Sequence, residues 1–224
     1  YILDSLSLIS REKAIINIHL PSDAHILRKP QARLKFEELF FLQLILLKDK
    51  NLRTQKINGH KFSRVGKFLN DFYHKKLPFE LTSAQKRVIK EIRSDVGSGR
   101  QMNRLLQGDV GSGKTMVAVM TMLIALDNDF QACLMAPTEI LANQHYSTIK
   151  KMLEGLGVEV ELLTGSTKTS ERKIIHEKLA SGELQILIGT HALIEESVKF
   201  NNLGFVVIDE QHRFGVAQRA KLWT

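Results

Sequence analysis

Residues 108–115 read GDVGSGKT, which fits the pattern G-x-x-x-x-G-K-[ST] at every fixed position. Glycines in such a loop permit positive φ and let backbone N–H groups close around phosphate oxygens with no Cβ in the way. Lys114 would place its charge on the β- and γ-phosphates, and Thr115 would offer a hydroxyl to Mg²⁺. The pattern therefore predicts a nucleoside triphosphate site made of Gly108, Gly111, Ser112, Gly113, Lys114 and Thr115.

On either side of this loop, short apolar runs alternate with helical patterns. A run before the loop predicts a strand, and the apolar stretch after it predicts a helix. This alternation indicates an α/β fold built on a mainly parallel sheet. The expected strands are Arg104–Gln107, Ala132–Ala136, Val158–Leu163, Gln185–Ile188 and Phe205–Ile208, and the expected helices are Lys114–Leu126, Glu139–Leu153 and Glu171–Leu179.

Two acidic residues, Asp209 and Glu210, directly follow the last of these strands. In a doubly wound sheet they would lie at the carboxyl edge, beside the P-loop. Asp209 would hold Mg²⁺, directly or through water, and Glu210 would orient and deprotonate the attacking water. Because phosphoryl transfer depends mostly on positioning and charge, Lys114, Asp209 and Glu210 are the candidate catalytic residues.

Residues 1–75 have helical signals and no strand–helix alternation. Ser10 is a candidate N-cap for a helix over Arg11–Ile18, and apolar residues recur at helical spacings over Gln31–Lys48. We expect a helical linker over residues 1–75 and an ATPase domain, incomplete at its C-terminus, over residues 76–224. The long helix is expected to support neighbouring domains, with membrane or partner binding as alternatives.

The composition is that of a globular protein, with 224 residues, 43% hydrophobic and 25% charged, and it excludes a disordered chain. The net charge of +8 comes mostly from residues 1–80, which indicates either contact with a polyanion or a solvated basic surface. The sequence predicts a cytoplasmic protein. It has a single cysteine, Cys133, no apolar run near the ~20 residues of a membrane span, and no secretory leader. The ends, without an initial Met or a final cap, suggest a fragment of a longer chain.

Five motifs in order resemble the RecG family of superfamily 2 branched-DNA translocases. They are QGDVGSGKT at 107–115, APTEILA at 136–142, LTGS at 163–166, IGTHAL at 188–193 and DEQHRFGV at 209–216. The resemblance continues upstream through FELTSAQ at 79–85 and FEEL at 36–39, so it covers nearly the whole chain.

The resemblance implies further roles. Phe79 and Gln85 match residues that recognise adenine by stacking and hydrogen bonding, while Gln211 and His212 match residues that couple the ATP and DNA sites. Thr138 and Thr164 are equally good helix caps, and His191 is equally a partner of another site residue. The family's DNA-facing positions are Pro137, Thr138, Thr164, Gly165, Thr190 and His191.

The resemblance implies the first ATPase domain of an ATP-dependent DNA helicase that acts on branched DNA, such as replication forks and Holliday junctions, in recombination and repair. The fold would be that of a P-loop NTPase (RecA-like), with helices on both faces of the parallel sheet, and residues 1–75 would be a helical linker and the tail of the family's DNA-wedge region. Its cofactors would be ATP and Mg²⁺. Its partners would be branched or duplex DNA and a second RecA-like domain of the same protein, with no membrane and a monomeric state. The alternatives are the motor of a transcription-repair coupling factor, a DNA-independent P-loop NTPase such as a small-molecule kinase, and a scaffold without catalysis.

Overall fold

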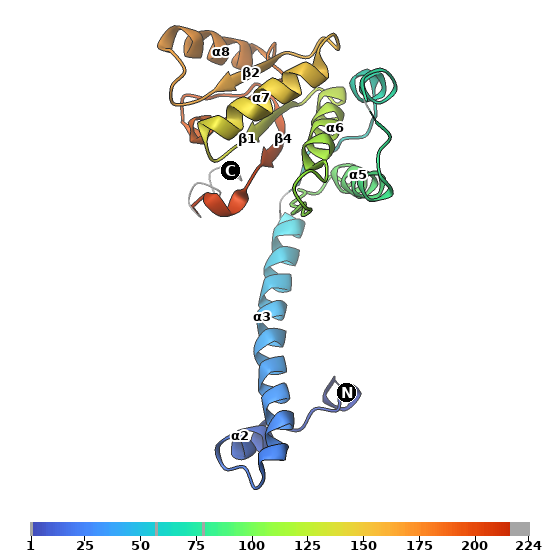
Figure 1. Ribbon diagram of the computed structural model, residues 1–224, viewed down its shortest axis with the longest axis vertical. Helices are drawn as coiled ribbons and strands as arrows, with labels where there is room; N and C mark the ends of the chain where they lie inside the picture. Colours follow the sequence, from blue (N-terminus) through green and yellow to red (C-terminus); the bar gives the residue numbers. More distant parts are fainter. Residues whose placement is uncertain (1, 57, 78, 216–224) are drawn as a thin grey trace. The chain divides into compact units, whose positions relative to one another are not determined.

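The computed structural model describes residues 2–56, 58–77 and 79–215. Contacts divide the chain into a first unit, which ends at Asn58, and a second unit, which begins at Gly59. The segment 59–75, expected within the linker, therefore packs with the second unit, where its helix α4 (Lys67–Asp71) contacts the helix that follows the P-loop. Figure 1 labels the main helices and strands.

The first unit consists of the helices α1 (Ile2–Ser5), α2 (Arg11–His19), η1 (Ala24–Leu27) and α3 (Arg28–Lys56). Ser10 caps α2 as expected, because its side chain accepts a hydrogen bond from the backbone N–H of Lys13 at 3.3 Å. Fully buried Ala14 lies on α2 where this helix packs against α3. The long helix therefore exists, and it extends beyond both ends of the range that its periodicity predicts.

The second unit is built on a parallel sheet. Within the described residues it has four strands in the order β2-β3-β1-β4, and every pair is parallel. Each strand overlaps an expected one, with ends that differ by a few residues. The strands are β1 (Gln131–Met135), β2 (Val160–Leu163), β3 (Ile186–Gly189) and β4 (Leu203–Ile208).

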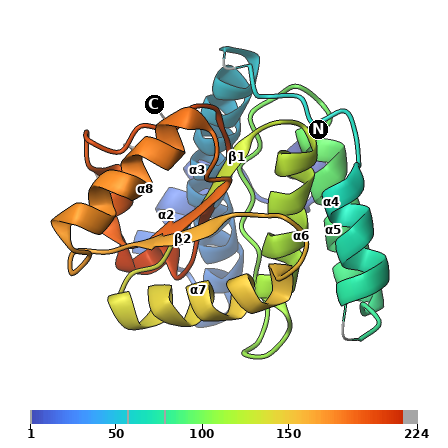
Figure 2. The same ribbon diagram turned by 90° about the horizontal axis from the view of Figure 1, so that it is seen from above.

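Helices cover both faces of the sheet, as the sequence predicts. Since side chains alternate along a strand, Ala132 and Leu134 of β1 join one apolar cluster, while Cys133 and Met135 join another. The first cluster includes side chains of α6 (Lys114–Asp127) and α7 (Glu139–Leu153). The second includes side chains of α8 (Thr169–Ser181) and η3 (His191–Ile194). Figure 2 shows α7 and α8 on opposite sides of β2.

Helix α6 is buried on nearly all sides, which explains why its residues are apolar all around the helix. It packs against β1 and β4, and α4 and α5 (Ser83–Val96) pack against it as well. Met122, Leu123 and Ile124 are at most 1% exposed. Contacts on all of its faces, rather than one apolar stripe, therefore hold α6 in position behind the P-loop.

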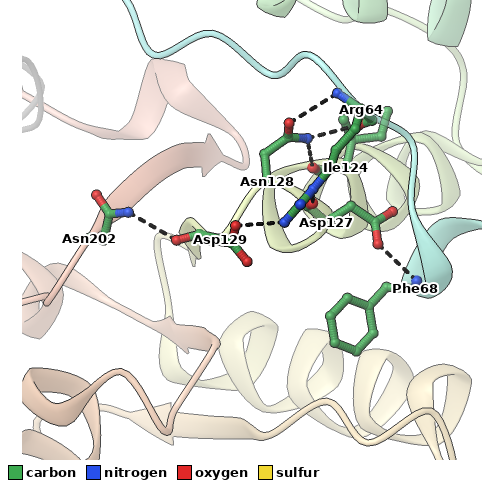
Figure 3. A network of polar contacts seen from close by, with 7 residues as sticks. All are labelled: Arg64, Phe68, Ile124, Asp127, Asn128, Asp129 and Asn202. Carbon is green, nitrogen blue, oxygen red and sulfur yellow. Dashed lines mark hydrogen bonds and ion pairs between the residues drawn. The ribbon is translucent and has the colours of Figure 1, made fainter.

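A polar network ties the segment before the P-loop to the carboxyl end of α6 (Figure 3). The buried carboxylate of Asp127 accepts hydrogen bonds from the backbone N–H groups of Phe68 at 2.9 Å and Leu69 at 3.2 Å, which lie in the first turn of α4. Asn128 exchanges two hydrogen bonds with the backbone of Arg64, at 2.8 and 3.1 Å. The guanidinium Nε of Arg64 donates to the carbonyl of Asp127. We call Arg64, Phe68, Leu69, Asp127 and Asn128 the helix clamp.

The strand expected at Arg104–Gln107 is not present, and residues 101–109 form no regular element. A strand needs a neighbouring ladder to satisfy its backbone groups, which an apolar run alone does not supply. Here Arg104 forms ion pairs with Glu91 at 2.7 Å and Asp95 at 2.6 Å of α5, and Leu105 is 61% exposed. The segment is therefore fixed by side chains rather than by a place in the sheet.

Within the described residues, no helix is both long enough and apolar enough to cross a membrane.

Candidate functional site

The P-loop bends where its glycines allow it. Gly111 and Gly113 both adopt left-handed backbone, with φ of +79° and +80°, on either side of Ser112. A Cβ at Gly113 would also collide with the side-chain amide of Gln85. Only glycine therefore fits at Gly113 without strain, and the loop keeps the form that binds anions through backbone N–H groups.

Lys114 is the first residue of α6, and its ammonium group lies over the P-loop. Its Nζ donates hydrogen bonds to the carbonyl oxygens of Gly108 at 2.7 Å and Asp109 at 2.9 Å. The free N–H groups of the first helical turn, which includes Thr115, add the positive end of the helix dipole. The loop, the lysine and the helix end together suit a phosphate chain, and the hydroxyl of Thr115 suits a hard cation beside it.

Gln85 contacts the P-loop directly. Its Nε2 donates a hydrogen bond to the carbonyl oxygen of Ser112 at 3.0 Å. Its Oε1 accepts from the backbone N–H of Thr82 at 2.9 Å, and Thr82 Oγ1 accepts from the backbone N–H of Gln85 at 3.2 Å. This capping box begins α5 and fixes the amide beside the loop. The other candidate adenine contact, Phe79, precedes α5 and is 51% exposed.

Asp209 and Glu210 follow β4 at the carboxyl edge of the sheet. The backbone N–H of Asp209 donates to the carbonyl of Met135 at 2.9 Å, which extends the ladder with β1. Glu210 has left-handed backbone, with φ of +49°, a conformation that costs a residue other than glycine of order 1–3 kcal/mol. Its carboxylate is at the surface, and its Oε2 lies 3.4 Å from Nδ1 of His212 in η4 (Gln211–Arg213).

The P-loop lies at this same edge. Because α6 ends at Asp127, shortly before β1 begins, the carboxyl end of α6 lies at the amino edge of the parallel sheet. The amino end of α6, with Lys114, is therefore directed toward the carboxyl edge, where Asp209 follows β4. Contacts between α6 and β4 support this arrangement, which can be followed in Figures 1 and 2.

The candidate DNA contacts also gather at the carboxyl edge, because each pair directly follows a strand. Pro137 and Thr138 come after β1, Thr164 and Gly165 after β2, and Thr190 and His191 after β3. Thr164 and Thr190 are only 3% and 1% exposed. Thr138, Gly165 and His191 of this set are therefore exposed, and Pro137 is half-buried.

Two of these threonines also stabilise local structure. The side chain of Thr138 caps α7 by accepting a hydrogen bond from the backbone N–H of Leu141 at 3.3 Å. Thr164 Oγ1 lies 2.9 Å from Ser166 Oγ, within the loop after β2. The hydroxyl of buried Thr190 has no hydrogen-bond partner among the described residues.

Two contacts at the site involve residues that sequence reasoning missed. Glu139 accepts hydrogen bonds from Ser166, at 3.1 Å from its backbone N–H and 2.9 Å from its hydroxyl. The bond from the Ser166 hydroxyl is the main cause that lowers the pKa of Glu139. His145 Nε2, on α7, lies 2.8 Å from Asp209 Oδ2. Glu139 lies within the motif at 136–142 and His145 just beyond it, but neither contact carries a local signal, because its partner is distant in the sequence.

A groove of about 420 Å³ lies beside α7, β2 and α8. Its lining includes Thr164 and Ser166, and also the carboxylates of Glu161 and Glu171. Two carboxylates make the groove a poor site for phosphate, which separates it from the P-loop.

Comparison with known proteins gives the family. The model of the DEAD/DEAH box helicases matches residues 82–224, well over half of the chain. The chain belongs to the DEAD/DEAH box helicases. Use of ATP comes with membership of this helicase family, and the match agrees with the P-loop and with the parallel sheet.

Individual relatives show which members of this family the chain resembles. It is 50% identical over 221 residues to the ATP-dependent DNA helicase RecG of Synechocystis sp., covering 99% of this chain and 26% of the relative. It is 47% identical to the RecG of Thermotoga maritima, again over 99% of this chain and 28% of the relative. The expected likeness to RecG is confirmed, and the chain spans about a quarter of the length of these relatives.

A solved structure also shows the likeness to RecG. RecG bound to a three-way DNA junction matches this chain with a TM-score of 0.83 and 45% identity, covering 96% of this chain and 29% of that one. The expected RecA-like P-loop fold is confirmed. The alternative of a transcription-repair coupling factor is not favoured, since these RecG helicases match the chain over 99% of its length.

Proposed function

We propose that this chain is the first ATPase domain, with a preceding helical segment, of an ATP-dependent translocase that acts on branched DNA. The observation that carries the proposal is that the P-loop and the acidic pair Asp209–Glu210 lie at one edge of a sheet in a chain related to RecG over 99% of its length. The name of the solved relative, RecG bound to a three-way junction, suggests branched DNA as the substrate.

In this proposal the P-loop binds the triphosphate of ATP. The backbone N–H groups of residues 111–115 and the Lys114 ammonium surround the β- and γ-phosphates and stabilise the charge that develops between them. Thr115 and Asp209 hold Mg²⁺, a hard cation that neutralises phosphate charge and suits their hydroxyl and carboxylate oxygens. Glu210 orients the attacking water and accepts its proton.

Residues around this centre recognise the base and the DNA. Gln85 hydrogen-bonds to the adenine edge, and the half-exposed ring of Phe79 stacks on the base. Thr138, Gly165 and His191 contact DNA phosphates from the accessible carboxyl edge, with Pro137, Thr164 and Thr190 shaping the loops that carry them. Gln211 and His212 follow Glu210 and transmit its state to the DNA-facing loops.

The proposal places a second RecA-like domain against this edge in the full-length protein, which would act as a monomer. An arginine from that domain would stabilise the transition state, a contribution worth about 10³–10⁵ in rate. This first domain alone would therefore bind ATP and hydrolyse it slowly.

The test measures DNA-stimulated ATP hydrolysis and fluorescent-nucleotide binding in the full-length protein. Lys114→Ala should abolish binding or turnover, and Glu210→Gln should keep binding while stopping hydrolysis. A three-way junction should stimulate the parent protein more than linear duplex of the same length. Retained DNA-stimulated hydrolysis in Lys114→Ala would contradict the assignment of the nucleotide site. Equal stimulation by both DNAs would contradict branched DNA as the preferred substrate.

A further inference from the structure

One contact at the carboxyl edge has no role in the function proposed above. His145 Nε2 lies 2.8 Å from Asp209 Oδ2, and the two side chains are only 17% and 31% exposed. The other carboxylate oxygen, Oδ1, accepts a hydrogen bond from the backbone N–H of Glu210 at 3.0 Å. Each oxygen of Asp209 therefore has its own donor.

An ionised carboxylate only accepts hydrogen bonds, so His145 Nε2 carries the proton in this contact. Rotation of the Asp209 carboxylate about its Cβ–Cγ bond would break the bonds at both oxygens at once. The backbone of Asp209 is fixed as well, through its hydrogen bond to Met135 of β1. The histidine thus removes the last free rotation of this side chain.

We propose that His145 is a positioning residue for Asp209, which it fixes in the one orientation that presents its remaining lone pairs to Mg²⁺. The inference rests on the proposed function, because that function assigns the cation to Asp209. Partners that orient a ligand in this way are worth about 10–100-fold in metal affinity. His145 does not itself contact the cation or the nucleotide.

The place of His145 on α7 gives this contact a second consequence. The same helix begins with Thr138 and Glu139, and Glu139 is hydrogen-bonded to the loop after β2. His145 lies about two turns further along α7. A shift of this helix that follows DNA contact at its start would therefore move the donor to Asp209.

The experiment uses two variants of the full-length protein that differ in the reach of their donor. His145→Gln keeps an N–H group at the same number of bonds from Cβ as Nε2, whereas His145→Asn is one bond too short. The measurement is the Mg²⁺ concentration that gives half-maximal tightening of a fluorescent ATP analogue. Binding of the analogue without Mg²⁺ and the melting temperature are measured alongside. Ser147→Ala, at an exposed position of α7, is the control.

We expect His145→Asn to raise the half-maximal Mg²⁺ concentration about 10–100-fold. Binding without Mg²⁺ should stay unchanged, and His145→Gln and Ser147→Ala should remain close to the parent. In an Asp209→Ala background, His145→Asn should have no further effect on Mg²⁺. His145→Ala replaces His145→Asn if the latter does not fold.

An unchanged Mg²⁺ requirement in His145→Asn overturns the inference, as does a lower melting temperature with no change in Mg²⁺. If Lys114→Ala still abolishes nucleotide binding in that case, the proposed function stands without the inference. If Lys114→Ala binds nucleotide normally, the proposed function itself is wrong.

Discussion

Glu139, the first residue of α7, binds Ser166 in the loop after β2 through both oxygens of its carboxylate. The two residues join two loops at the carboxyl edge whose neighbours, Thr138 and Gly165, are candidate DNA contacts. Arg172 supports the same loop by donating to the carbonyl of Thr164 at 3.0 Å. The loops after β1 and β2 therefore form one connected surface.

Glu139→Gln should weaken DNA binding several-fold, because the charge-assisted hydrogen bonds from Ser166 to the carboxylate are replaced by weaker neutral ones. Removing a negative charge near DNA would by itself increase the affinity for DNA. A lower affinity therefore shows that Glu139 acts by positioning the loop. Fluorescence anisotropy with a labelled three-way junction, over a range of salt concentrations, makes the measurement. The slope of affinity against salt should not change. Glu154→Gln, at the other end of α7, is the control, and tighter binding by Glu139→Gln would contradict the prediction.

The stabilisation from the Glu139–Ser166 contact should be lost at acidic pH. The Ser166 hydroxyl holds the pKa of Glu139 below its usual range. Because the pKa is lower in the folded state, the stabilisation is complete above the unfolded pKa and is lost as the pH falls through the folded one. Ser166→Ala should raise the pKa of Glu139 toward the usual value, which carboxyl ¹³C NMR can follow. An unchanged pKa in that variant would exclude the hydroxyl as the cause.

Asp127→Ala should lower the free energy of unfolding by about 2–3 kcal/mol. It removes the acceptor of two backbone N–H groups in the first turn of α4 and leaves them poorly paired. Urea denaturation measures the change. Asp129→Asn is the matched control, since Asn tolerates the left-handed backbone of this position (φ +64°), and the ion pair with Arg64 at 2.6 Å that it removes is exposed and worth at most about 1 kcal/mol. Equal losses in the two variants would contradict the helix clamp.

Cys133 should not react with thiol reagents in the folded protein at pH 8. It lies in the centre of the sheet, 1% exposed, and burial raises the pKa of its thiol to about 12. A buried neutral thiol reacts only when the structure opens. Because this chain has a single cysteine, its labelling kinetics report that opening directly, provided that any further cysteines of the full-length protein are first replaced. Rapid labelling under native conditions would contradict the structure.

Gln85→Glu should reduce the preference for ATP over GTP by about tenfold, the effect of one or two lost hydrogen bonds to the base. The glutamate still accepts from Thr82, so the capping box remains, while the Nε2 donor, which bonds to Ser112 and is proposed to bond to the base, is lost. Competition of ATP and GTP against a fluorescent nucleotide measures the preference, with Ser83→Ala as control. If the preference is unchanged, Gln85 only supports the P-loop.

Much of the fold can be predicted from the sequence, because caps, apolar periods and motifs are local signals. Helix α7 has the predicted bounds because the Thr138 cap and the apolar period both mark it. The strand expected at Arg104–Gln107 is wrong, since apolar character does not supply a neighbouring ladder. The P-loop and the acidic pair are visible as motifs, whereas the contacts that His145 and Glu139 make are not. Their partners lie 64 and 27 residues away, and only the fold brings them together.

The helix clamp has a mechanical consequence. Helix α6 is grasped at its carboxyl end by residues 64–69, and its amino end begins at the P-loop. A helix of 14 residues is a stiff rod about 21 Å long. The clamp and the phosphate loop therefore stand at the two ends of one stiff element, so that neither end can tilt without displacing the other.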